Sequence, residues 1–213
     1  MDSYGLQLLS TAGPEPISLA QAQLHCRSDQ SENDPELALL IKAVRKYFEK
    51  WTNQSFTTQT YQLTLDHFPN YMGLALSDYN RLWDLVGIRL PKSPPIPQGQ
   101  VTVQSITYVD TTGTPQTMDP TTYNVDLTTV PVRITPAYGK IWPIARYQAG
   151  AVQIQFQVIP VVDEDVLAGM LLLLGHWNEH REGVLAGTYA EVPHGICSIL
   201  ALNSDWQYGS KAG

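Results

Sequence analysis

The hydrophobic positions of this chain change their spacing twice. Between Asp34 and Trp51 they follow the period of an amphipathic helix. From about residue 57 to residue 160 they alternate with polar positions, as in strands with one buried face. After Asp163 a second apolar run of helical character extends to about Glu182. The sequence therefore predicts helices near both ends and strands in the middle.

Capping residues mark the starts of the first two predicted helices. Ser18 can cap a short helix, and Gln21, three residues later, completes a capping box. We expect this helix to end near Arg27. The next helix has Asp34 as its N-cap and Pro35 at its first position, where proline is favoured. A last short helix is expected after residue 193.

The polar face of the helix that follows Asp34 is predicted to be exposed to solvent. Its charged residues are Glu36, Lys42, Arg45, Lys46, Glu49 and Lys50. Such a face is most often simply solvated, and a docking surface is the alternative. Arg45 and Lys46 are therefore also candidate residues of an interface between subunits.

Strand candidates span residues 60–68, 101–110, 121–127, 132–139 and 151–158. Turn residues separate them, among them those at 110–113 and the pair Asp119-Pro120. A long stretch from Phe68 to Gln100 has no firm period and contains several prolines. The pattern predicts a small antiparallel β domain with one long loop.

The last predicted strand has two faces of different character. Val152, Ile154, Phe156 and Val158 form the apolar face, and the other face consists of Gln153, Gln155 and Gln157. A row of neutral amides can be exposed to solvent, or it can be covered by a neighbouring copy of the chain. We take the three glutamines as candidate residues of an interface between subunits.

The fold class that follows is α+β, a helical bundle formed by N- and C-terminal helices with an inserted small antiparallel β domain. Residues 1–16 show no clear period and are expected to be mobile. The expected parts are 1–56 for the N-terminal helical part and 57–160 for the inserted β domain, with its long loop at 68–100. Residues 161–213 form the C-terminal helices and tail, which pack with residues 17–53.

Composition narrows the range of functions. A net charge of -7 argues against a protein whose main task is to grip the phosphate backbone of DNA. Only 15% of the residues are charged, which suits a surface that is covered by other subunits. Cys26 and Cys197 are read as buried thiols, and no secretory signal is visible. The apolar run at 166–175 is too short to cross a membrane.

One motif has the spacing of a metal site. His176, Glu179 and His180 fit the pattern H-x-x-E-H of inverted zinc proteases, in which two histidines on one helix face bind zinc and the glutamate acts as general base. The acidic residues downstream, at 182, 191 and 205, are few and close to the end of the chain. We therefore interpret the motif as an ordinary helix end, and expect no catalytic residue, metal or cofactor.

Six stretches in a fixed order carry a family resemblance. They are PISLAQAQLHCR, DPELALLIKAVRKYFEKWTNQSF, TQTYQLTLDHFP, IRLPKSPPI, VQSITYVDTTGTPQTMDPTTYNVD and VPHGICSILAL. Together they resemble the head-tail connector, or adaptor, proteins of long-tailed bacteriophages and prophages. The resemblance covers nearly the whole chain, and the segment HWNEHRE falls where the family has a polar helix end.

The resemblance implies a structural virion protein and no enzyme. It also implies a cyclic ring, which is twelve-fold in the family, and such a ring needs heterologous contacts that close after a fixed rotation. The ring would lie in the neck of the virion, beneath the portal protein, and bind a stopper or a tail-completion or tail-terminator protein on its other side. DNA would pass through the lumen without sequence-specific binding. Assembly would take place in the host cytoplasm, without a membrane.

The tail of the chain is the candidate surface for docking on the portal. It contains Trp206, Gln207, Tyr208 and Lys211, and aromatic residues commonly anchor interfaces. A frayed terminus is the alternative.

Two other functions stay open from the sequence. One is a zinc-dependent hydrolase that uses His176, Glu179 and His180. The other is a ligand-binding β module, directed at carbohydrate through Tyr79 and Trp83.

Overall fold

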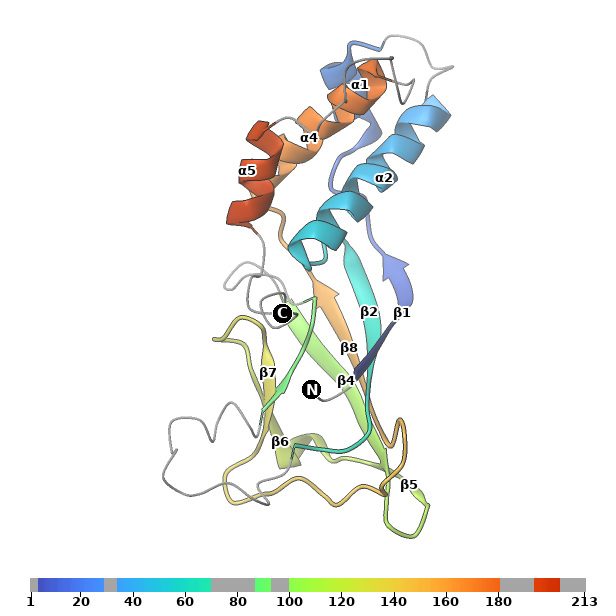
Figure 1. The fold of residues 1–213 in the computed structure, drawn as a ribbon, viewed down its shortest axis with the longest axis vertical. Coiled ribbons are helices and arrows are strands. Elements are labelled where there is room, and N and C mark those ends of the chain that lie inside the picture. The colour runs from blue at the N-terminus through green and yellow to red at the C-terminus, as the bar shows by residue number, and fades with distance from the viewer. Residues whose placement is uncertain (1–3, 29–33, 70–86, 93–99, 181–193, 204–213) are drawn as a thin grey trace. The chain divides into compact units, whose positions relative to one another are not determined.

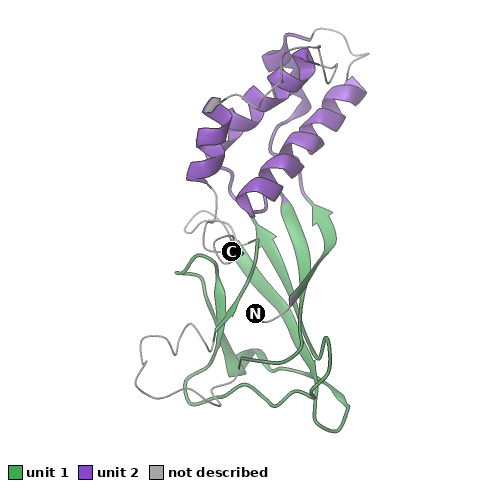
Figure 2. Cartoon of the chain, in the orientation of Figure 1, with its two compact units in different colours: residues 1–12, 58–160 green, residues 13–57, 161–213 purple. Residues whose placement is uncertain are grey.

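The computed structural model describes residues 4–28, 34–69, 87–92, 100–180 and 194–203 of the chain (Figure 1). They divide into two compact units, which Figure 2 colours separately. Residues 1–12 and 58–160 form the first, here called the sheet unit, and residues 13–57 and 161–213 form the second, the helical unit. The chain is thus a mixture of helices and antiparallel strands, in agreement with the predicted α+β class.

A five-stranded antiparallel sheet forms the larger part of the sheet unit (Figure 1). Its order is β1 (Tyr4–Ala12), β2 (Thr58–Leu65), β8 (Val152–Ile159), β4 (Gln100–Val109) and β5 (Pro115–Thr117). A three-stranded sheet follows the order β3 (Ile88–Arg89), β7 (Arg133–Pro136) and β6 (Tyr123–Asp126), with a short 3-10 helix, η2 (Pro120–Thr122), before β6. Each strand predicted from alternation is present.

The core of the sheet unit follows from the alternation of side chains along the central strands. Tyr61 on β2 stacks on Phe156 of β8, with ring centroids 5.6 Å apart. Beyond the strands, Phe68 stacks on Trp142 with an angle of 8° between the rings. All four rings belong to one buried cluster, which also includes Ile154 at the centre of β8. Burial of this one face keeps the sheet in register.

Three loops of the sheet unit use the same local bond pattern. In each, an aspartate accepts hydrogen bonds from the backbone N–H and the hydroxyl of a threonine two residues later: Asp110 with Thr112, Asp119 with Thr121, and Asp126 with Thr128. Bonds from the Thr112 hydroxyl and the Thr114 N–H lower the pKa of Asp110 to about 2. Such side-chain bonds replace the backbone bonds that a turn cannot make.

The helical unit consists of α1 (Leu19–Cys26), α2 (Asp34–Thr52), α4 (Glu164–Glu179) and α5 (His194–Leu202). The predicted capping box is present, since the Ser18 hydroxyl accepts from the N–H of Gln21 and the Gln21 side chain accepts from the N–H of Ser18. Arg27 ends α1 in the left-handed conformation. The four helices share one hydrophobic cluster, whose members include Ile17, Ala22, Val44, Phe48, Met170, Leu173, Ile196 and Leu200.

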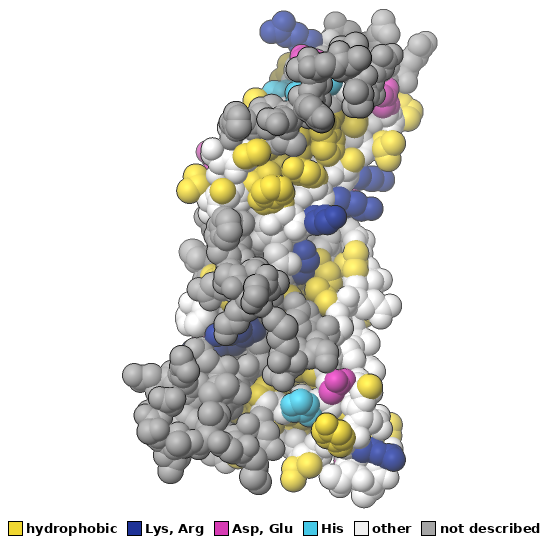
Figure 3. Space-filling model, viewed as in Figure 1, with side chains coloured by type: hydrophobic (Ala, Val, Ile, Leu, Met, Phe, Trp, Pro, Cys, Tyr) yellow, Lys and Arg dark blue, Asp and Glu magenta, His cyan; other side chains and the backbone are white. Residues whose placement is uncertain are grey.

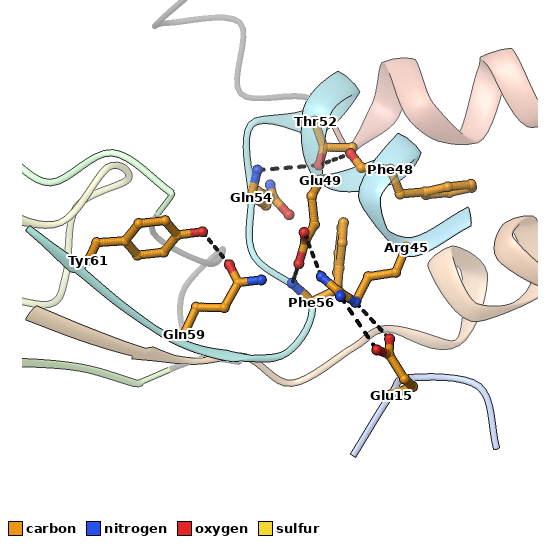
Figure 4. Close-up of polar contacts among 9 residues, drawn as sticks. All are labelled: Glu15, Arg45, Phe48, Glu49, Thr52, Gln54, Phe56, Gln59 and Tyr61. Carbon is orange, nitrogen blue, oxygen red and sulfur yellow. Dashed lines mark hydrogen bonds and ion pairs between the residues drawn. The ribbon is translucent and has the colours of Figure 1, made fainter. Parts of the chain in front are cut away.

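Arg45 is the buried centre of an ion cluster in the helical unit, shown in Figure 4, whose two carboxylates are partly exposed. Its side chain contacts Glu15 at 2.6 Å and Glu49 at 2.8 Å. The other oxygen of Glu49 accepts a hydrogen bond from the N–H of Phe56 at 3.2 Å. The cluster therefore joins the segment before α1, the helix α2 and the segment after it.

Two expectations from the sequence are corrected here. Arg45 is only 6% exposed, so it does not belong to a solvated face of α2; its long stem packs inward while its charge is neutralised by two carboxylates. The start of the chain was expected to be mobile and part of the helical portion. Residues 4–12 instead form β1 and belong to the sheet unit, because they pair with β2 along its whole length.

We predict that Gly169→Leu destabilises the helical unit. A Cβ atom at residue 169 would lie 3.1 Å from Cγ2 of Ile199 and 3.3 Å from Cζ of Phe48, closer than ordinary contact. Overpacking of this kind costs about 1–3 kcal/mol. The control is Ala168→Leu, at a neighbouring exposed position of the same helix, which should leave the unfolding free energy nearly unchanged. Equal effects of the two variants in denaturant unfolding would contradict the packing described.

We also predict different effects for two neighbouring cations of α2. Arg45→Met leaves the partly exposed carboxylates of Glu15 and Glu49 without their shared counter-ion, and we expect a loss of about 1–3 kcal/mol of unfolding free energy. Lys46→Met removes an exposed charge and should change stability by less than about 0.5 kcal/mol. Thermal unfolding followed by circular dichroism measures both. A stable Arg45→Met variant would show that the cluster contributes little.

Candidate functional site

The face of the five-stranded sheet opposite the core is the candidate functional site. Along β8, residues Val152, Ile154, Phe156 and Val158 are buried, whereas Gln153 is exposed and Gln155 and Gln157 are half-buried. The three glutamines therefore share one side of the central strand, as the sequence predicted. Because β8 lies between β2 and β4, their surroundings come from both neighbours.

Strand register determines which residues flank the glutamines. Gln155 lies between Gln62 of β2 and Ser105 of β4. The other two glutamines are flanked by threonines on both sides: Thr64 and Thr107 for Gln153, and Thr60 and Thr102 for Gln157. Amides and hydroxyls thus cover the middle of this side of the sheet.

The surface extends over all five strands and contains no charged residue within them. We call it the neutral face, and its members are Gly5, Gln7, Ser10, Ala12, Thr58, Thr60, Gln62, Thr64, Gln100, Thr102, Ser105, Thr107, Val109, Pro115, Thr117, Gln153, Gln155, Gln157 and Ile159. In the view of Figure 3, the described surface over β1 and β2 shows mainly hydrophobic and other uncharged side chains. In a chain with 20 acidic and 13 basic residues, this is an unusual stretch of surface.

Hydrogen bonds within the neutral face are few. The Gln155 amide donates to the Gln62 carbonyl across the strands at 3.3 Å, and the Thr107 hydroxyl donates to the backbone carbonyl of Gln153 at 3.5 Å. Amide and hydroxyl groups can both donate and accept, so they can form bonds with a second protein surface. Covering neutral groups costs less free energy than covering charges. The arrangement therefore suits contact with another protein surface.

The other predicted interface residues lie in the helical unit. Lys46 is exposed on α2 and is available to a partner. Arg45 is buried and already bound to Glu15 and Glu49, so its role in the structure is internal to its own unit. The two adjacent cations thus have different surroundings.

Several residues named from the sequence lie outside the described residues. They are the tail residues Trp206, Gln207, Tyr208 and Lys211, and the aromatic residues Tyr79 and Trp83 of the loop at 68–100.

The two histidines of the H-x-x-E-H motif do come together. His176 lies in the last turn of α4 and His180 ends the helix, with ring centroids 4.7 Å apart. Glu179 is exposed at the same helix end. Within the described residues, however, no cluster of three or more His, Cys, Asp or Glu side chains is arranged to hold a metal ion. The motif thus has a pair of adjacent rings and no third ligand in that part of the chain.

No described helix is both long and apolar enough to cross a bilayer.

Sequence reasoning missed strand β1, which contributes Gly5, Gln7 and Ser10 to the neutral face. A weak signal was present, since Leu6 and Leu8 alternate with Gly5 and Gln7. The alternation is short because the register shifts between Leu8 and Ser10, where an extra residue interrupts the period.

Comparison with known proteins finds similar solved structures but no matching sequence family. No family model matches the chain, and no curated protein matches it. Among solved structures, a chain in the virion of a native gene transfer agent (GTA) particle matches with a TM-score of 0.68 and 17% identity, over 93% of this chain and 94% of that one. A chain in the neck of an empty GTA particle, computed with C6 symmetry, matches with a TM-score of 0.64 and 16% identity, over 94% and 95%.

A third match is a chain in the neck of a native GTA particle, computed with C12 symmetry, with a TM-score of 0.56 and 14% identity, over 93% of this chain and 94% of that one. In each case the likeness covers both units. At this level of identity the likeness concerns the fold, and the chain has the fold of a protein found in the neck of gene transfer agent particles.

Proposed function

We propose that this chain is a structural subunit of the neck of a phage-like particle. Specifically, it acts as the head-to-tail connector, or adaptor, ring that docks beneath the portal and links the capsid to the tail while leaving a channel for DNA. The observation that carries the proposal is the neutral face, found on a chain whose fold matches chains in two solved necks over more than nine-tenths of its length. The chain would act by assembly and not by catalysis.

The symmetry of the matched necks supports a ring. The solved necks were computed with C6 and C12 symmetry, which requires several equivalent copies about an axis. A cyclic ring needs two different surfaces on each subunit, one for each neighbour. We propose that the ring contains twelve copies, in accordance with the C12 neck.

The neutral face is the surface that we assign to contact between copies. Gln153, Gln155 and Gln157 form its centre, and Lys46 of α2 is a further contact residue. Interfaces are depleted in charged residues at their centres, because an unpaired charge loses its hydration there. A neutral face also carries no net repulsion between identical copies, which matters for a chain with a net charge of -7.

The remaining partners follow from the position in the neck. We propose that the portal protein binds the tail residues Trp206, Gln207, Tyr208 and Lys211, and that a stopper, tail-completion or tail-terminator protein binds on the other side of the ring. The acidic balance of the chain favours a channel in which DNA moves without strong binding. We also propose that residues 58–160 act as an insertion between the two parts of the helical unit, residues 13–57 and 161–213.

Electron microscopy of the full chain mixed with its portal protein tests the proposed function. We expect an additional ring of density on the portal, with the twelve-fold symmetry proposed for this chain. The control is the portal alone under the same conditions. A portal without added density, together with a chain that stays monomeric, would overturn the assignment to the neck.

The role of the neutral face has a separate test. We expect the double variant Gln153→Glu and Gln157→Glu to fold normally but to lose ring formation, because like charges from many copies would meet in a desolvated contact. The matched control is Thr111→Glu with Gln148→Glu, at exposed loop positions of the same unit. Light scattering gives the oligomeric state of both proteins. Normal rings from the first variant would show that another surface joins the copies.

A further inference from the structure

The free edge of β1 is a second unusual feature of the sheet unit. Strand β1 is the first strand of the five-stranded sheet and pairs only with β2. It is nine residues long, and residues 7–12 are exposed. Its outer backbone N–H and carbonyl groups have no partner strand in the part of the chain that the structure describes.

The sequence of β1 contains almost none of the features that protect sheet edges. Natural edges are shortened, or carry charged residues, proline or a bulge, because an open edge pairs readily with another strand. Residues 4–12 include no charged residue and no proline. Leu8 and Leu9 are 49% and 43% exposed. The bulge between Leu8 and Ser10 is the one protective feature, and it leaves the first half of the strand regular.

The opposite edge of the same sheet, strand β5, has features that protect it against pairing with another strand. Strand β5 has only three residues and begins with Pro115. Within this strand, Gln116 donates to the Asp110 carboxylate at 3.0 Å, so a charged group lies at that edge. The contrast within one sheet indicates that the β1 edge is left open for a partner.

We propose that β1 accepts an additional strand from a second copy of this chain, so that backbone hydrogen bonds join neighbouring copies. The inference rests on the proposed ring and names one of its contacts. A neighbour that covers the neutral face also reaches β1, since Gln7 and Ser10 belong to that face. The edge is uncharged, as expected where both partners come from the same acidic chain.

Pairing at β1 must be heterologous in a ring. Pairing of β1 with β1 of another copy would be isologous and would stop at two copies, whereas pairing with a different segment of the neighbour continues around an axis. The strand is about 30 Å long at the usual rise per residue, which is enough for several backbone bonds. Strand addition of this kind provides affinity through the main chain and needs no charged side chain.

Hydrogen–deuterium exchange of the full chain, free and in the ring, tests the proposal. In the free chain the outward amides of β1 should exchange fast, and about half of the amides in residues 4–12 should become protected in the ring. The central strand β8, paired on both sides, is the internal control and should be protected in both states. Unchanged exchange in β1 of an assembled ring would overturn the inference while leaving the ring function standing.

Two further outcomes are decisive. Protection of β1 only after the portal or a tail-side protein is added would assign the edge to that protein and overturn pairing between copies. If no ring forms at all, the proposed function fails, and the inference fails with it.

A variant separates the edge from the neutral face. Leu8→Lys with Leu9→Lys adds the charges that natural edges carry, and we expect assembly to weaken by at least about tenfold with an unchanged melting temperature of the free chain. The control is Leu127→Lys with Val130→Lys, at exposed apolar positions elsewhere in the unit, which should assemble normally. Equal assembly of both variants would overturn the proposal.

Discussion

Burial of one face of the central strand β8 is the constraint on which the sheet unit depends. Val152, Ile154, Phe156 and Val158 must all point into the core, so the three glutamines between them must all point out. A shift of one residue would exchange the two sets and bury three amides. Because of this two-residue period, the inward residues of β8 stabilise the unit and the outward residues determine the composition of its outer surface. Selection on that surface can act on the outward positions without disturbing the inward ones.

Much of the fold could be predicted because local signals were strong. The capping box at Ser18, the proline after Asp34 and the alternation along β8 each depend on residues close in sequence. Strand β1 could not be predicted with the same means, since its period is broken by a bulge and its partner β2 is far away in the chain. Long-range pairing of this kind leaves little trace in a short segment.

The candidate site also contains residues that the sequence could identify and residues that it could not. The glutamines of β8 could be named from the sequence, because alternation shows which side of a strand they occupy. The extent of the neutral face could not, since it depends on the register of five strands that are distant in sequence. Arg45 was misplaced for a related reason. A helical period assigns a charged residue to the outside, whereas here Glu15, thirty residues earlier in the chain, joins Glu49 in offsetting the burial of the Arg45 charge.

The arginine cluster has a consequence for sequence comparison. Glu15 is bound by the Nε side of the guanidinium and Glu49 by its Nη1 atom, so the two carboxylates use different parts of one planar fork. A lysine has a single ammonium group and lacks that divided geometry. Exchange of the two cation types, which is common at exposed helix positions, should therefore be rare at residue 45 in proteins that share this fold, while it stays frequent at residue 46. An arginine or a lysine at the position of residue 45 would then indicate whether a distant relative keeps this ion cluster around α2.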